Sequence, residues 1–306
     1  MTLLSLLGSF ELGVIYAIMA LGVFVSFRTL NMPDLSVDSS FVLGAAVSVV
    51  LSTLGHPVLG LYLAILAGGC AGSITALLHT KLKIQPLLAG ILTMLAFYSL
   101  NLKVMGGKAN IPLLNKPTVF TLFEPVIAGE YSKLVLATII LFVVLAILFL
   151  FLKTRLGFVV RATGDNDQMV RALGVNTDYI ILIGLAVSNG LVALSGAMIA
   201  QHQSFVDIGM GIGMVIIGLA SVIIGEVVFG MRSLLNRLVA VILGSILYRL
   251  IIAFALEIGM PPTDLKLVSA VIVALAISMP IIKKRLLFAK KKYAYQGSER
   301  SRKPNA

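Results

Sequence analysis

Long apolar runs separated by short polar segments dominate the pattern of this chain. About nine runs are long enough to cross a bilayer, because a helix needs roughly 20 apolar residues to span the hydrocarbon. The predicted spans are 9–27, 38–54, 58–79, 85–102, 133–152, 179–200, 210–230, 238–257 and 264–282. The pattern therefore predicts an all-α integral membrane protein.

The composition agrees with lipid as the solvent of this chain. Hydrophobic residues make up 59% of the 306 residues and charged residues 12%, and the mean hydropathy is +1.05. A soluble domain carries about 25% charged residues, so too few polar groups are present to cover a water-facing surface. The first apolar run lacks a basic n-region, and we expect it to be retained rather than cleaved as a signal peptide. Cys70 is the only cysteine, which excludes an intrachain disulfide and a cysteine-based metal site.

The distribution of lysine and arginine predicts the orientation of the spans. Residues 283–306 form a tail with nine lysines or arginines against one acid, Glu299. Such a tail is typical of a cytoplasmic anchor near anionic lipid, which we favour over nucleic-acid binding. Working back from the tail, segment 153–178 also lies in the cytoplasm and the N-terminus lies outside. Segment 103–132 is an exception to the rule that lysine and arginine are enriched in cytoplasmic segments, because it is placed outside and contains three lysines.

Two stretches of the chain resemble one another. In residues 20–46 and in residues 193–220, a small-residue helix is followed by an Asp-containing break and a second small-residue helix. The predicted topology runs the two copies in opposite directions. Residues 9–102 and 179–282 are therefore predicted to form inverted repeats of four spans each, joined by the span 133–152. This arrangement is common in transporters, and it predicts one transmembrane permease domain over residues 1–282.

The sequence lacks the common motifs of catalysis and nucleotide binding. The only Gly-Lys pair, Gly107-Lys108, lacks the first glycine and the Ser or Thr of a phosphate-binding loop. No H-E-x-x-H or G-x-S-x-G motif occurs, and the three histidines are scattered, so neither a metal centre nor a hydrolase is predicted. We expect a non-catalytic chain that binds no cofactor and does not itself hydrolyse ATP.

A polar stretch, "VVRATGDNDQMVRALGVNTD", occupies residues 159–178 between two apolar runs. Asp165 is predicted to cap a helix over 166–173, with Gln168 at its third position and Gly174 at a left-handed stop. A helix this short is not stable in water without packing. Its apolar face must therefore lie on lipid, on the rest of the chain or in a partner's groove. The geometry alone fits an ordinary interfacial linker equally well.

The same stretch resembles the cytoplasmic coupling loop of the branched-chain amino acid permease family of bacterial ATP-binding cassette importers. The matching residues are Arg161, Ala162, Asn166, Ala172, Leu173, Gly174, Val175 and Asn176. The stretch LGVIYAIMALG (12–22) is similar to the first span of that family. MPDLSVD (32–38) resembles the D-L-S-V-G element of the related ribose-type permeases, with Asp38 in place of glycine. Together with the loop, the stretch GILTMLAFYSLNLKVMGGKANIPL (90–113) most resembles the branch labelled as tryptophan/tyrosine permeases.

The resemblance implies a fold like that of type II ATP-binding cassette importers. Two permease subunits, expected as a homodimer, would line a path across the bacterial cytoplasmic membrane. Two separate ATPase subunits, which bind ATP and Mg, would dock beneath, and an extracytoplasmic solute-binding protein would deliver a small solute, expected to be an amino acid. The residues implied to couple the permease to the ATPase are Arg161, Asp165, Asn166, Asp167, Met169, Arg171, Ala172, Leu173 and Gly174.

Polar residues at membrane depth are candidates for the translocation path, namely Asp34, Asp38, Asn189, Asp207 and Arg249. Arg249 lies about 18 Å beyond the cytoplasmic start of its span. It could attract a substrate carboxylate or make a structural contact, with Glu226 and Glu257 as candidate acids. Asp34 and Asp38 could polarise a gate or cap the second span, and we favour capping.

Two other classes of function stay open at this point. An ion-coupled secondary transporter would use the intramembrane charges as coupling sites. A non-transporting scaffold would leave the repeat and Arg249 unexplained. The substrate is open among aromatic amino acids, branched-chain amino acids and nucleosides.

Overall fold

Seven helices in the described part of the chain are long and apolar enough to cross a membrane. The computed structural model describes residues 3–125, 129, 131–261, 264, 267–272, 274–275 and 278. The long helices are α1 (Leu3–Val23) with its π-helical continuation η1 (Phe24–Thr29), α2 (Ser36–Thr53), α3 (Pro57–Thr80), α4 (Pro86–Val104), α6 (Ser132–Lys153), α9 (Thr177–Gln203) and α11 (Leu234–Glu257). They confirm seven of the predicted spans.

The other two predicted spans have different outcomes. The span predicted at 210–230 contains a shorter helix, α10 (Met214–Phe229), because residues 208–213 form turns. At 16 residues, α10 is about 24 Å long, which is less than the hydrocarbon thickness. Of the span predicted at 264–282, the described residues 267–272, 274–275 and 278 are helical, and much of the rest lies outside the described residues. The basic tail 283–306 lies wholly outside them. The total of nine spans and the inverted repeat stay predictions.

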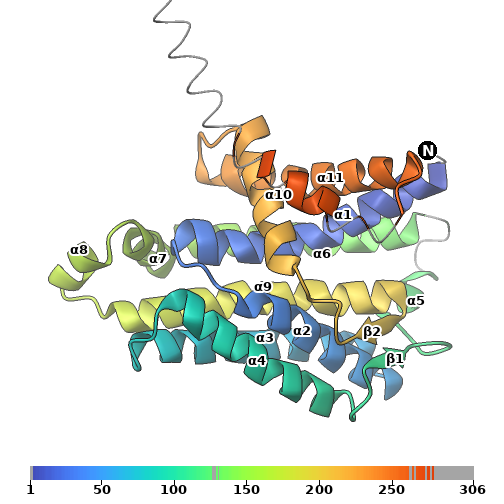
Figure 1. Cartoon of the computed structure of the whole chain (residues 1–306), viewed down its shortest axis with the longest axis horizontal. Helices are drawn as coiled ribbons and strands as arrows, with labels where there is room; N and C mark the ends of the chain where they lie inside the picture. The colour runs from blue at the N-terminus through green and yellow to red at the C-terminus, as the bar shows by residue number, and fades with distance from the viewer. Residues whose placement is uncertain are drawn as a thin grey trace, which may run out of the picture.

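The central helix of the bundle is α9, which packs against α2 and α3 on one side and α1 on the other (Figure 1). Glycines allow the close approach of these helices. A side chain at Gly44 of α2 would collide with the backbone of Ala193 in α9, and one at Gly196 of α9 would collide with the backbone of Phe41 in α2. Small residues thus let two membrane helices pack backbone to backbone.

Serine hydroxyls tie α1 to its neighbours across the bundle. Ser188 and Ser195 of α9 donate to the backbone carbonyls of Gly22 and Ile15 in α1, at 2.7 and 2.9 Å. On the opposite side, α1 packs against α6, α10 and α11. Because lipid offers no hydrogen-bond partner, such interhelical bonds help to determine how the helices pack.

The two ends of the bundle carry different small elements (Figure 1). At one end, β1 (Asn110–Pro112) pairs antiparallel with β2 (Phe205–Asp207), beside the short helix α5 (Val119–Phe123). At the other end lie α7 (Arg155–Asp165) and α8 (Asp167–Ala172). The small sheet corrects the all-α prediction, since strands of three residues are too short to show an alternating pattern in the sequence.

Candidate functional site

The polar segment between α6 and α9 folds into two helices instead of the single predicted one. The hydroxyl of Thr154 caps α7 by accepting the backbone N–H of Gly157 at 3.2 Å. The side-chain oxygen of Asn166 caps α8 by accepting the N–H of Met169 at 3.0 Å. The cap predicted at Asp165 is wrong, because Asp165 is the last residue of α7. Asp and Asn cap helices about equally well, so the presence of α7 decides between them.

The predicted stop of α8 at Gly174 is confirmed. Gly174 has a φ of +81°, a left-handed conformation that glycine adopts without steric cost. Beyond this turn, Asp178 in the first turn of α9 lies 3.3 Å from Arg171 of α8 and 3.6 Å from Lys81 at the end of α3. Partly exposed ion pairs contribute about 0–1 kcal/mol each, so these contacts hold α8 only loosely.

Most of the residues predicted to couple the chain to an ATPase are exposed. The exception is Arg161 in α7, which is half-buried. Within α8, Val170 is 2% exposed and packs against the chain, whereas Met169 is 51% and Leu173 is 74% exposed. The exposed residues of the predicted set are Asp165, Asn166, Asp167, Met169, Arg171, Ala172, Leu173 and Gly174. Met169 and Leu173 thus form an apolar spot at the end of the bundle.

Replacing Asn166 with alanine should loosen α8 without unfolding the bundle. Loss of an N-cap costs about 1 kcal/mol, which corresponds to roughly fivefold faster hydrogen exchange of amides that open locally. We expect this increase at residues 167–172, measured by mass spectrometry. Asp165→Ala is the matched control and should leave the exchange of α8 unchanged. Equal exchange in both variants would show that Asn166 does not support the helix.

Helix α7 rests directly on the end of the first span. A side chain at Gly164 would collide with the backbone carbonyl of Thr29 in η1, so glycine is required for this approach. η1 in turn is tied to α10, since Nε of Arg28 lies 2.7 Å from Oε1 of Glu226. The sequence offered no signal for this ion pair, because its partners are 198 residues apart. The contacts give a physical route from α7 to η1 and α10.

The break between α1 and α2 is organised by Asp34. Its Oδ1 accepts the backbone N–H of Ser36 at 2.8 Å and the Ser36 hydroxyl at 2.6 Å. Its Oδ2 accepts the side-chain amide of Asn189 in α9 at 2.7 Å. Asp34 thus supplies an acceptor for the first N–H of α2, although the N-cap residue of that helix is Leu35. Asp34 and Asn189 are both buried, so in this conformation protein encloses these two candidates for the translocation path.

Asp38 caps a different helix from the one predicted. It lies in the first turn of α2, yet its carboxylate accepts the backbone N–H groups of Gly213 at 2.9 Å and of Val215 at 2.8 Å. These amides belong to the N-terminus of α10, where unpaired N–H groups and the helix dipole favour a negative charge. Asp38 therefore joins α2 to α10 across 175 residues of sequence.

The other two path candidates make different contacts. Asp207 in β2 accepts the backbone N–H of Gly209 at 2.8 Å and so supports its own turn. The guanidinium carbon of Arg249 lies 3.9 Å from the centre of the Tyr16 ring in α1, a cation–π contact. Its Nε is buried and has no hydrogen-bond partner among the described residues. Glu226, one candidate acid for Arg249, instead belongs to the ion pair with η1.

One buried polar pair near the sheet was not singled out from the sequence. Oε2 of Glu11 in α1 lies 2.8 Å from Nε2 of His202 in the last turn of α9. The ring of Phe120 in α5 stands edge-on to the imidazole, with the two planes at 85°. The pair connects the start of the first span to the end of α9, which no local motif could have indicated.

The fold and the site define a multi-pass membrane protein with broken helices inside its bundle and a small exposed helix at one end. The chain belongs to the family described as the branched-chain amino acid transport system permease component, whose model matches residues 5–278. It is therefore the permease component of a transport system.

Three relatives show what the chain is similar to. The chain is 44% identical over 260 residues to the tyrosine transport system permease protein of Clostridioides difficile (strain R20291), covering 85% of each chain. It is 34% identical over 279 residues to an uncharacterised protein of Rickettsia prowazekii (strain Madrid E), covering 89% of this chain and 96% of the relative. It is 28% identical over 220 residues to the autoinducer 2 import system permease protein LsrC of Yersinia enterocolitica, covering 70% and 58% respectively. No solved structure matches the chain.

Proposed function

We propose that this permease is the membrane-spanning subunit of an ATP-binding cassette importer for an amino acid. The observation that carries the proposal is α8, a capped helix that leaves Met169 and Leu173 open at one end of the bundle. A pair of exposed apolar anchors on a short helix suits a groove on a partner protein. Since the sequence has no phosphate-binding loop, the hydrolysis of ATP is assigned to that partner.

The proposed mechanism uses the contacts around α7. Closure of two ATPase subunits on ATP and Mg would move α8, and α7 would transmit the displacement to η1 at the contact of Gly164 with Thr29. From η1, the ion pair of Arg28 with Glu226 leads to α10. Cores and interfaces respond to such shifts by switching between packed arrangements, which would change the access of the path.

The proposed assembly contains a second copy of this chain and an extracytoplasmic solute-binding protein. The cytoplasmic side is the end that carries α8, and the N-terminus of α1 lies outside. An aromatic amino acid is the favoured substrate because of the sequence relation to a tyrosine permease. Asp34, Asp38, Asn189, Asp207 and Arg249 remain the proposed polar residues of the path.

Uptake of labelled tyrosine into proteoliposomes should require ATP, the partner ATPase and the solute-binding protein. We expect no uptake from a proton or sodium gradient alone, because the chain would depend on the ATPase for energy. Uptake driven by an ion gradient without ATP would overturn the proposal in favour of a secondary transporter. ATP-dependent uptake of another amino acid, with tyrosine inactive, would keep the mechanism and change the substrate.

A further inference from the structure

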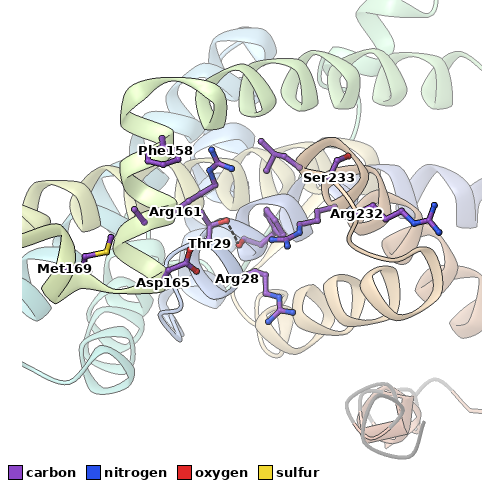
Figure 2. Close-up of a pocket in the computed structure, with 12 residues that line it drawn as sticks. Arg28, Thr29, Phe158, Arg161, Asp165, Met169, Arg232 and Ser233 are labelled. Atoms are coloured by element: carbon purple, nitrogen blue, oxygen red, sulfur yellow. Dashed lines mark hydrogen bonds between the residues drawn. The ribbon is translucent and has the colours of Figure 1, made fainter. Parts of the chain in front are cut away.

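A basic cavity of about 460 Å³ lies between α7 and the corner that joins α10 to α11 (Figure 2). Residues of η1 form its floor, with Phe24 and Thr29 among them. The arginines that line it come from three separate segments of the chain, and they are Arg28, Arg161, Arg232 and Arg237. Arg161, Asp165 and Met169 also line the cavity and belong to the residues proposed to contact the ATPase, but that role assigns no small ligand to the cavity.

The charge of the cavity is not balanced by the chain. Asp165 is the single acid among its lining residues, and Glu226 neutralises Arg28 from beside it. Two positive charges are therefore left in excess over the acids that line or pair with the cavity. Like charges held together at a partly buried site are stabilised by an anion, so the cavity is suited to an anionic ligand.

Arg161 lines the cavity and has one donor without a partner among the described residues. Its Nε is buried and makes no hydrogen bond within the described part of the chain, while its guanidinium lies 5.5 Å from the centre of the Phe158 ring. Arg161 and Arg28 project from different sides of the cavity, and Arg232 extends outward (Figure 2). A guanidinium presents a planar fork of N–H groups that matches the oxygens of a phosphate group.

The proposed orientation places the cavity at the depth of lipid headgroups. The cavity lies at the end of the bundle where α6 ends at Lys153 and α9 begins at Thr177. In the proposed topology this end meets the cytoplasmic surface of the membrane. Phosphate groups lie just outside the hydrocarbon at this level. Phe158, an apolar side chain that lines the cavity, is 63% exposed, as expected for contact with acyl chains.

We propose that this cavity binds the phosphate group of an anionic phospholipid. Arg161 and Arg237 would hold the phosphate oxygens, and the lipid's negative charge would offset the excess positive charge beside η1. Arg161 belongs to α7, so an occupied cavity would hold α7 against η1 and the α10–α11 corner. The site shares Arg161 with the proposed coupling surface, and it does not depend on the identity of the transported solute.

Native mass spectrometry of the purified full chain tests the proposal. We expect phosphatidylglycerol to remain bound at least tenfold more strongly than phosphatidylcholine, because the cavity would prefer a net negative lipid. The double variant Arg161→Gln plus Arg237→Gln should lose this preference. Arg155→Gln, an exposed arginine of α7 that does not line the cavity, is the matched control and should keep it. Arg161→Lys should give an intermediate preference.

Several outcomes would overturn the proposal. One is equal binding of phosphatidylglycerol and phosphatidylcholine by the unaltered chain. This comparison needs no variant, so it tests the proposal even if the double variant fails to fold. Another is an unchanged preference in the folded double variant. A third is displacement of phosphatidylglycerol by inorganic phosphate at equal concentration, with the phosphate bound at the same arginines. That result would show that the ligand is a free anion and not a lipid. Loss of ATPase binding in the double variant with unchanged lipid binding would indicate a protein contact instead.

Discussion

Replacing Met169 and Leu173 together with aspartate should abolish binding of the partner ATPase and reduce uptake at least tenfold. Both side chains are largely exposed in this chain, so the charges cost little in the isolated permease. In the proposed complex they would be buried in an apolar groove, where an unpaired carboxylate costs several kcal/mol. Co-purification with the ATPase and ATP-driven uptake in proteoliposomes measure the effect.

A matched control is available at the same end of the bundle. Leu82, in the turn between α3 and α4, is 65% exposed and lies outside α7 and α8. Leu82→Asp should leave ATPase binding and uptake near their normal levels. If the double variant still binds the ATPase and transports normally, the coupling role assigned to α8 is wrong, whereas equal losses in both variants would show that the effect is not specific to α8.

Replacing Asp38 with alanine should lower the stability of the folded chain by about 3 kcal/mol or more and abolish transport. Hydrogen bonds to a charged group contribute roughly 1.5–3 kcal/mol each, and Asp38 makes two to the N-terminus of α10. Without it, the amides of Gly213 and Val215 lose their partner in a bundle surrounded by lipid, where unsatisfied backbone groups are costly. Thermal unfolding in detergent and uptake measure the two effects.

Asp207 provides the control for the loss of an aspartate. It also accepts a backbone N–H at 2.8 Å, but from Gly209 in its own turn, and it is only partly buried. Asp207→Ala should therefore cost about 1.5 kcal/mol, the lower end of the range for one hydrogen bond to a charged group. A loss of stability in Asp38→Ala no larger than in Asp207→Ala would contradict the capping of α10 by Asp38.

The long spans could be predicted from the sequence because lipid imposes a simple condition on the backbone. In hydrocarbon every N–H and C=O must be bonded within the segment, so an apolar run of sufficient length becomes a helix. The run 133–152 illustrates this, since the corresponding helix is Ser132–Lys153. The run 210–230 shows the limit, because hydropathy does not reveal that the chain turns until Gly213, which has a φ of +88°.

The α7–α8 segment could be predicted only in part. Gly174 indicated the end of α8 because few residues other than glycine adopt its left-handed backbone. The start of α8 was misplaced at Asp165, since Asp165 and Asn166 have similar capping ability. The choice depends on α7, which packs on η1 through the small contact at Gly164, and that contact is not visible in a local pattern.

By itself, the sequence determined that this chain belongs in lipid, where seven of its spans lie, and that a short polar helix stops before Gly174. These properties follow from composition and from backbone rules that act within one segment. Only the tertiary structure decided that Asp38 caps α10, that Glu226 pairs with Arg28 and that Arg249 lies over Tyr16. Each of these contacts joins residues from distant segments, and a charge in a membrane helix takes whichever compatible partner the packing brings within reach.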